Sequence, residues 1–166
     1  MRPRRGRCAP FLLAVLAIVT GACSGAASPT PTISPGTVAA PREVNIIARE
    51  YSFDPPVVDL IPGETVLLHV IDAGLEVHEA IIGDTAVQAA WEVAEAAVAG
   101  APPGPTPLVR VPPGMEGLRV VVRSGERVDV VWTIPIGSAP LIVGCHIPGH
   151  WAKGMQIPVR FVAPGG

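Results

Sequence analysis

The amino-acid sequence predicts an all-β protein, an antiparallel β-sandwich of seven to eight short strands with one inserted short helix. Glycine and proline together make up 38 of the 166 residues, far above ordinary usage, which favours short elements separated by turns. Hydrophobic residues make up 49% of the chain, but only 4% of the residues are aromatic. Short apolar runs recur between the turns, at a spacing that is typical of a sandwich.

Residues 1–22 are predicted to be a lipoprotein signal peptide. A basic segment, 1–7, precedes an apolar run, 11–19, which is too short to span a bilayer. The stretch TGAC follows at 20–23, with small residues before the cysteine. It resembles a bacterial lipoprotein signal, in which Cys23 becomes the lipidated first residue. The alternative is an ordinary cleaved signal peptide with a chance cysteine.

Residues 23–41 are predicted to be a flexible tether, because they are rich in Ser, Thr, Pro and Ala and carry no charge. Cleavage of the signal removes four arginines and leaves eight basic against 14 acidic residues, a formal net charge of −6. The remaining chain has no basic stripe, which argues against a nucleic-acid partner.

The folded domain is expected to occupy 42–166. It opens with a strand region at 43–53, and two strands around a Pro-Gly turn follow within 56–72. In the second of these, Val66, Leu68 and Val70 alternate on one face, which predicts their burial. Further strands are expected within 76–83, 117–122, 127–134, 140–144 and 155–163.

One helix is expected over 86–98. Val87, Trp91 and Val98 fall on a single stripe at helical spacing, so Trp91 is expected to make core contacts. The Gly/Pro-rich stretch 100–107 ends this helix.

The stretch VGCHIPGHWAKGM, 143–155, is the candidate metal site. Cys145, His150 and Met155 are five residues apart, and a Pro-Gly pair forces a turn between the first two. Cys145 is left alone once the signal is removed and Cys23 is lipidated, and a lone cysteine in an exported protein favours metal ligation. Thiolate, thioether and imidazole together suit copper. The second imidazole is expected from His78, which follows a turn-like segment and opens a short strand.

The segment CHIPGHWAKGM, with HEAIIG upstream, resembles the cupredoxins, the blue type 1 copper proteins. Its C-x2-P-G-H part is similar to azurin-like, auracyanin-like and rusticyanin-like members. The resemblance covers roughly 42–163 and implies a Greek-key sandwich that binds one copper ion, cycling between Cu(I) and Cu(II). It also implies the ligands: His78, Cys145, His150 and, as the axial thioether, Met155. Many members brace the copper loop with an asparagine shortly before the upstream ligand, and Asp72 stands nearest that role here.

Two further histidines and one tryptophan are not expected to be ligands. His146 is expected to lie at the surface or next to the ligands, because its side chain points away from that of Cys145 in an extended chain. His69 is expected to be a solvated or packing histidine. Trp151 could shield the copper or help a partner to dock, and the sequence leaves both possibilities open.

Four protein ligands leave copper no open position, so the predicted function is single-electron transfer and not catalysis. The expected partners are a protein electron donor and a protein acceptor, with the monomer held to a membrane by its N-terminal lipid. The expected location is the outer face of the cytoplasmic membrane or the periplasm. Three alternatives remain: a module for copper delivery or storage, an enzyme with an open copper site, and a metal-free structural lipoprotein.

Overall fold

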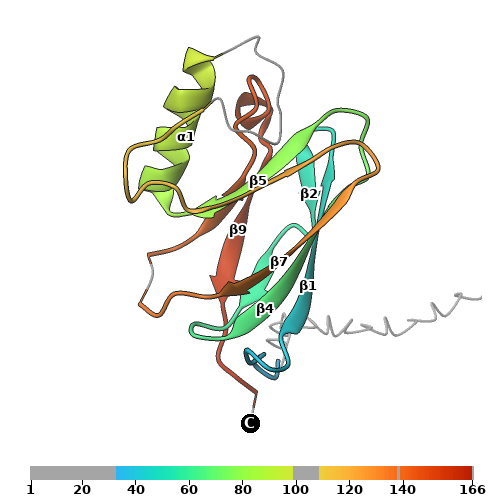
Figure 1. Ribbon diagram of the computed structural model, residues 1–166, viewed down its shortest axis with the longest axis vertical. Coiled ribbons are helices and arrows are strands. Elements are labelled where there is room, and N and C mark those ends of the chain that lie inside the picture. Colours follow the sequence, from blue (N-terminus) through green and yellow to red (C-terminus); the bar gives the residue numbers. More distant parts are fainter. Residues whose placement is uncertain (1–32, 99–108, 138, 166) are drawn as a thin grey trace, which may run out of the picture.

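The structure is a computed structural model that describes residues 33–98, 109–137 and 139–165. The predicted signal peptide, Cys23 and the first part of the tether lie outside the described residues. In the described part of the chain there are nine strands, one α-helix and one 3-10 helix (Figure 1). Their bounds are β1 Arg42–Arg49, β2 Ser52–Asp54, β3 Val58–Leu60, β4 Thr65–Asp72, β5 His78–Gly83, α1 Thr85–Ala97, β6 Leu118–Val122, β7 Arg127–Thr133, β8 Ile142–Gly144, the 3-10 helix Trp151–Lys153, and β9 Gln156–Phe161.

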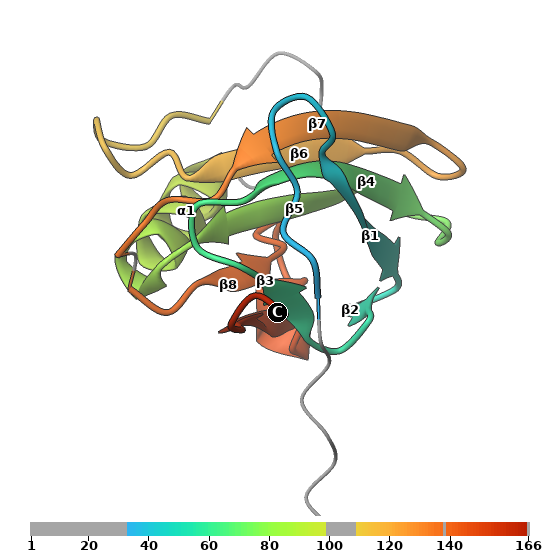
Figure 2. The same ribbon diagram turned by 90° about the horizontal axis from the view of Figure 1, so that it is seen from below.

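The strands form two sheets, in the orders β2-β1-β4-β7 and β3-β9-β8-β5-β6 (Figures 1 and 2). This confirms the predicted β-sandwich with one short helix. Two strand pairs, β1 with β4 and β3 with β9, are parallel, so the sheets are mixed and not purely antiparallel. The strand count exceeds the prediction because the expected first strand is split at Tyr51, whose positive φ of 63° separates β1 from β2.

The main core fills the space between the two sheets. Alternation along β4 buries Val66, Leu68 and Val70, as the sequence predicted. In the other sheet, Val120 and Val143 contribute to the same cluster. Cys145 and Met155 also belong to this cluster, so the candidate metal site lies at the edge of the hydrophobic core.

Strand β5 is buried along its whole length, because both of its faces are covered. Ala80 and Ile82 face the core between the sheets, whereas Ile81 packs against Val87 and Trp91 of α1. Figure 2 shows α1 beside the sheet that contains β5 and β8. The helix therefore covers the outer face of the strand that begins with His78.

Helix α1 matches its predicted range to within one residue at each end. Its N-cap is Asp84, whose carboxylate accepts hydrogen bonds from the backbone N–H groups of Ala86 and Val87. The expected core contact of Trp91 is confirmed, since only 5% of it is exposed and its Nε1 donates to the carbonyl of Glu116.

The last part of the expected tether, 33–41, contacts the domain. Ile33 forms an isolated bridge with Pro164. Gly36 donates to the Glu64 carboxylate and accepts from the backbone N–H of Thr65. Among the described residues, no helix is long and apolar enough to cross a bilayer.

Candidate metal centre

The loop between β8 and β9 carries three of the four predicted ligands. Cys145 directly follows β8 and Met155 directly precedes β9, and the backbone N–H of Cys145 donates to the carbonyl of Met155 at 3.1 Å. Between them the chain turns at Gly149 and Gly154, whose φ values of 90° and 89° favour glycine. Met155 also donates its N–H to the carbonyl of His150 at 3.2 Å, which closes the loop on itself.

The structure brings the predicted ligands together in one buried cluster. The Sγ of Cys145 lies 3.3 Å from Nδ1 of His150, and the ring centroids of His150 and His78 are 5.2 Å apart. His78, Cys145 and Met155 are fully buried, and His150 is 4% exposed. Two imidazoles and a thiol are thus collected from β5 and from one loop, and Met155 lies in the same hydrophobic cluster as Cys145.

The ring of His78 has one buried nitrogen without a hydrogen-bond partner. Its Nδ1 lies 3.1 Å from Oδ2 of Asp72 at the end of β4, while its Nε2 is buried and has no hydrogen-bond partner. A buried polar atom without a partner costs free energy and calls for an explanation. A metal ion that accepts the lone pair of this nitrogen would provide one, so the donor set fits a soft transition metal.

The thiol of Cys145 is strongly shielded from water. Burial raises its pKa to about 12, and the negative charge of Glu79 acts in the same direction. Backbone hydrogen bonds from Glu79 and Ile147 oppose this shift. The metal-free site therefore favours the neutral thiol, and the thiolate that metal ligation requires would form only with a cation close to the sulfur.

His150 is almost completely buried, although it lies on a Pro-Gly loop. Its Nε2 lies 3.1 Å from Oε2 of Glu76, and the ring of Tyr51 meets it edge-on with centroids 5.1 Å apart. Burial lowers the pKa of His150, and the neighbouring His78 adds to this effect. The half-exposed Glu76 and Tyr51 therefore separate the His150 ring from solvent.

The predicted ligands lie close together, but their side chains are not arranged around a common point as in a formed metal site. In the described part of the chain, no three His, Cys, Asp or Glu side chains converge as a metal site. Asp72 contacts Nδ1 of His78 and Glu76 contacts Nε2 of His150, so the other nitrogen of each ring has no carboxylate partner among the described residues.

The bracing of the Cys145 loop comes from Glu79 and not from Asp72. The register of β5 and β8 pairs Ile81 with Gly144, and continuing it places His146 opposite Glu79. The carboxylate of Glu79 accepts the backbone N–H of His146 at 3.1 Å. Sequence reasoning missed this contact, although a glutamate inside the apolar stretch HEAIIG was a signal for a paired, buried charge.

His146 is buried next to the ligands, which excludes the surface position. Its Nε2 lies 2.6 Å from Oε1 of Gln88 and its Nδ1 lies 2.8 Å from Oε2 of Glu92, both on α1. Its ring stacks on Trp151 with centroids 4.5 Å apart. Gln88 is itself fixed by donating to the carbonyl of Ile142 in β8. Helix α1 thus holds the residue that directly follows Cys145.

His69 lies away from the candidate ligands. Its Nδ1 is 2.7 Å from Oδ1 of Asp129 and 2.8 Å from a guanidinium nitrogen of Arg127, both on the neighbouring strand β7. It is 4% exposed, so it is a packing histidine and not a solvated one.

Comparison with solved structures places the fold among the cupredoxins. The chain is similar to a dithionite-reduced auracyanin from Roseiflexus castenholzii, with 17% identity, a TM-score of 0.59, and coverage of 73% of this chain and 97% of that one. It is also similar to auracyanin A, described as a blue copper protein, from Chloroflexus aurantiacus (19%, 0.57, 74% and 100%). An azurin from Methylomonas sp. strain J gives 13% identity and a TM-score of 0.55, with 75% and 100% covered. The chain therefore has the cupredoxin fold.

A curated protein is related along nearly the whole chain. This is the copper-resistant cuproprotein CopI of Pseudomonas aeruginosa, which is 29% identical over 185 aligned residues, covering 93% of this chain and 96% of CopI. No protein-family model matches the sequence.

Proposed function

We propose that this chain is an exported copper protein that carries single electrons between redox proteins. The observation that carries the proposal is the buried cluster in which the Cys145 sulfur lies 3.3 Å from His150, with the His78 ring packed against the same imidazole. One copper ion bound there would supply a Cu(I)/Cu(II) couple. His78, Cys145 and His150 are its proposed strong ligands, and Met155 its weaker fourth ligand.

The protein's own contribution is to fix these donors and keep water out. Cys145 and Met155 are tied by a backbone hydrogen bond and enclosed in the hydrophobic core. A rigid, dry site limits the rearrangement that a change of oxidation state requires. Four protein donors also leave no position for a substrate, so we propose electron transfer and no enzymatic reaction.

Addition of Cu(II) to the purified protein tests this proposal. We expect one copper per chain, an intense visible charge-transfer band from the Cys145 thiolate, and a reversible voltammogram. Cys145→Ser should abolish the band, because a hydroxyl gives no such transition. A strongly coloured copper complex in that variant would contradict the ligand assignment.

Copper delivery or storage is the second candidate function, favoured by the similarity to a copper-resistance protein. The two functions differ in how readily the metal leaves. A carrier of electrons retains copper against a chelator in both oxidation states, whereas a delivery protein releases it to a competing Cu(I) chelator. Rapid and complete transfer of Cu(I) to the chelator, together with the absence of a reversible Cu(I)/Cu(II) couple in voltammetry, would support delivery over electron transfer.

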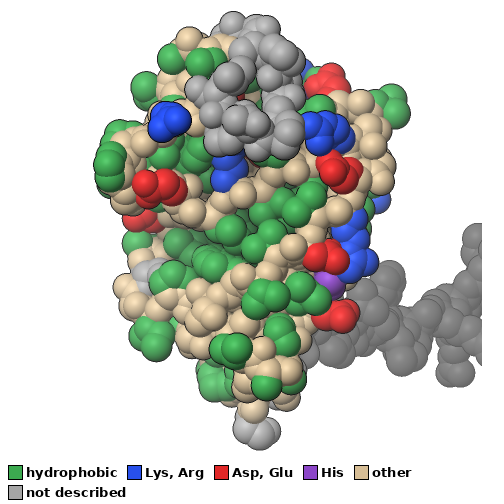
Figure 3. All heavy atoms as spheres, in the orientation of Figure 1, with side chains coloured by type: hydrophobic (Ala, Val, Ile, Leu, Met, Phe, Trp, Pro, Cys, Tyr) green, Lys and Arg blue, Asp and Glu red, His purple; other side chains and the backbone are tan. Residues whose placement is uncertain are grey.

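We further propose that the mature protein is a lipoprotein monomer, anchored at Cys23 on the outer face of the cytoplasmic membrane or in the periplasm. The signal-like residues 1–22 and the short motif before Cys23 support this location. Its proposed partners are a redox donor and a redox acceptor. On the face seen in Figure 3, acidic and basic side chains are interspersed around apolar ones, without a basic stripe that would suit a nucleic acid.

A further inference from the structure

We propose that Glu79 is a positioning residue of the copper centre, and that the ion pair between Glu79 and Arg119 sets its reduction potential. Glu79 lowers the potential in this proposal, and Arg119 raises it. The inference rests on the copper site proposed above and concerns how that site is regulated by its surroundings.

The first support is the position of Glu79 between the two ligand-bearing segments. Glu79 directly follows His78, and its Oε1 accepts the N–H of His146, which directly follows Cys145. Its side chain is fully buried. One carboxylate thereby links the upstream ligand strand to the cysteine loop, so its removal would loosen the spacing of both ligands.

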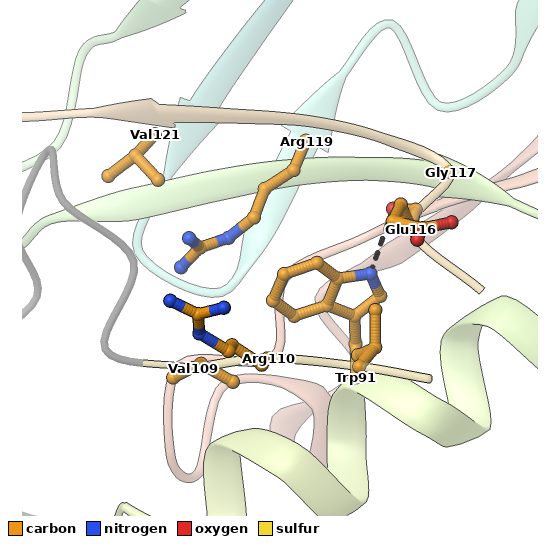
Figure 4. Close-up of a pocket in the computed structure, with 8 residues that line it drawn as sticks. Trp91, Val109, Arg110, Glu116, Gly117, Arg119 and Val121 are labelled. Atoms are coloured by element: carbon orange, nitrogen blue, oxygen red, sulfur yellow. Dashed lines mark hydrogen bonds between the residues drawn. The ribbon is translucent and has the colours of Figure 1, made fainter. Parts of the chain in front are cut away.

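The second support is the partner of the other carboxylate oxygen. The Nε of Arg119 on β6 donates to Oε2 of Glu79 at 2.8 Å. Its Nη2 donates to Oε1 of Glu95 on α1 at 3.1 Å, and its guanidinium lies 4.7 Å from the ring centre of Trp91. Figure 4 shows Arg119 reaching over Trp91 at the wall of a pocket. A chain of charges thus runs from helix α1 to the residue beside Cys145.

The third support is the electrostatic reach of Glu79. Its fully buried carboxylate contacts the backbone N–H of the residue that directly follows Cys145, so its charge lies close to the proposed copper. Interactions between charges are strong where water is excluded. Oxidation of the centre adds one positive charge, so a nearby carboxylate stabilises the oxidised form and a nearby guanidinium stabilises the reduced form.

An electrostatic role of Glu79 and Arg119 predicts shifts of the reduction potential that a purely structural role does not predict. Glu79→Gln removes a negative charge with little change in shape, so the reduction potential should rise. Arg119→Met in the Glu79→Gln background removes the opposing charge as well, and the potential should return towards the wild-type value. Arg119→Met alone leaves both Glu95 and the fully buried Glu79 without their guanidinium partner, whereas the double variant leaves only Glu95 in that state, so the double variant is expected to fold better.

The test is voltammetry of the copper-loaded full chain, with copper content measured for each variant. Glu95→Gln is the matched control, because it removes the outer carboxylate of the same arginine and should raise the potential less than Glu79→Gln. At equal copper content, an unchanged or lowered potential in Glu79→Gln would overturn the proposal. So would a double variant whose potential moves further from the wild-type value.

A measurement on the metal-free protein separates this inference from the copper proposal. The His146 amide proton should move upfield in Glu79→Gln, because a neutral acceptor replaces a charged one, while the amide of Thr133 on β7 should not move. An unchanged His146 shift would refute the positioning contact. A wild-type protein that binds no copper would instead refute the proposed function.

Discussion

At the scale of single residues, both candidate imidazole ligands are held by a carboxylate outside the ligand motif. Asp72 orients the ring of His78, and Glu76 contacts that of His150. Cys145 shares a backbone hydrogen bond with Met155. The carboxylates of Asp72 and Glu76 therefore fix the two imidazoles independently of each other.

His78→Gly should abolish the intense visible band on copper addition, because one of the two imidazoles is lost. Added free imidazole should restore the band by entering the space that the side chain leaves. His69→Gln is the control, since that histidine pairs with Asp129 away from the cluster and its loss should leave the spectrum unchanged. A spectrum that survives His78→Gly would show that the upstream ligand has been misplaced.

Met155→Leu should keep the copper and the colour while raising the reduction potential. The thioether is a weak donor, and its removal destabilises the oxidised ion more than the reduced one. Leucine has a similar volume, so the fully buried position should remain packed. Voltammetry and copper analysis check this, and complete loss of copper would reverse the proposed order of ligand strengths.

At the scale of elements, α1 and the sheet beneath it are fitted closely. The first turn of the helix places Val87 close to Gly83 at the end of β5 and to Gly117 just before β6. A Cβ at Gly117, where φ is 58°, would lie 2.6 Å from the carbonyl oxygen of Ile82 and 2.9 Å from Val87. The glycine is therefore needed both for its backbone conformation and for the approach of the helix.

Gly117→Ala should lower the free energy of unfolding by about 1–2 kcal/mol for the left-handed backbone and by about 1–3 kcal/mol more for the steric clash. Gly125→Ala is the matched control, because φ is 75° there and nothing lies within 4 Å of the added Cβ. Urea unfolding of both variants checks the difference. An equal loss of unfolding free energy in both variants would show that the helix shifts to accommodate the added Cβ at no energetic cost.

The contact between Glu95 of α1 and Arg119 of β6 should make stability depend on pH. Burial, followed by the charge of Glu79, raises the pKa of Glu95 to about 7, and Arg119 only partly opposes this. The folded state therefore holds this proton more tightly than the unfolded state, whose pKa is about 4.3. The contribution of Glu95 to the free energy of unfolding is therefore fully present below about pH 4.3 and is lost as the pH rises through the folded-state pKa of about 7.

Between pH 5 and pH 8 the loss at Glu95 should be on the order of 2 kcal/mol. Urea unfolding of the metal-free protein at both pH values measures it, and Glu95→Gln should remove most of this difference. The other titrating groups are the same in both proteins, so they cancel in the comparison. An equal pH dependence in the variant would show that Glu95 is already ionised at pH 5.

At the scale of the whole molecule, the candidate metal centre lies where both sheets and the helix meet. β5 supplies the candidate ligand His78, β4 supplies its hydrogen-bond partner Asp72, and the β8–β9 loop supplies the other three candidate ligands. The chain before residue 33 lies outside the described residues, and its proposed role is to hold this domain at a membrane.

Cys23→Ser should release the protein from the membrane fraction or leave it uncleaved, with the copper site intact. Two or more acyl chains anchor a protein stably, at about 0.8 kcal/mol per buried CH2. Fractionation and mass spectrometry of the mature N-terminus check this. A wild-type mature chain that is soluble and unmodified at its N-terminus would refute the anchor.

The sequence by itself determined the local features of this protein. The strands, the helix and the turns were predictable because alternation, helical periodicity and Gly/Pro turns act over a few residues. The loop from Cys145 to Met155 was predictable for the same reason, because its candidate ligands are close in sequence. The burial of Val66, Leu68 and Val70 also followed from the pattern of one strand.

Only the tertiary structure decided which distant segments meet. The pairing of β5 with β8 aligns Ile81 with Gly144 and thereby puts Glu79 opposite His146, 67 positions later in the chain. The parallel pairing of β1 with β4, and the burial of His146 under α1, were equally invisible in local patterns. A buried carboxylate such as Glu79 can be noticed in a sequence, but its partner is chosen by sheet register and packing, which depend on the whole chain at once.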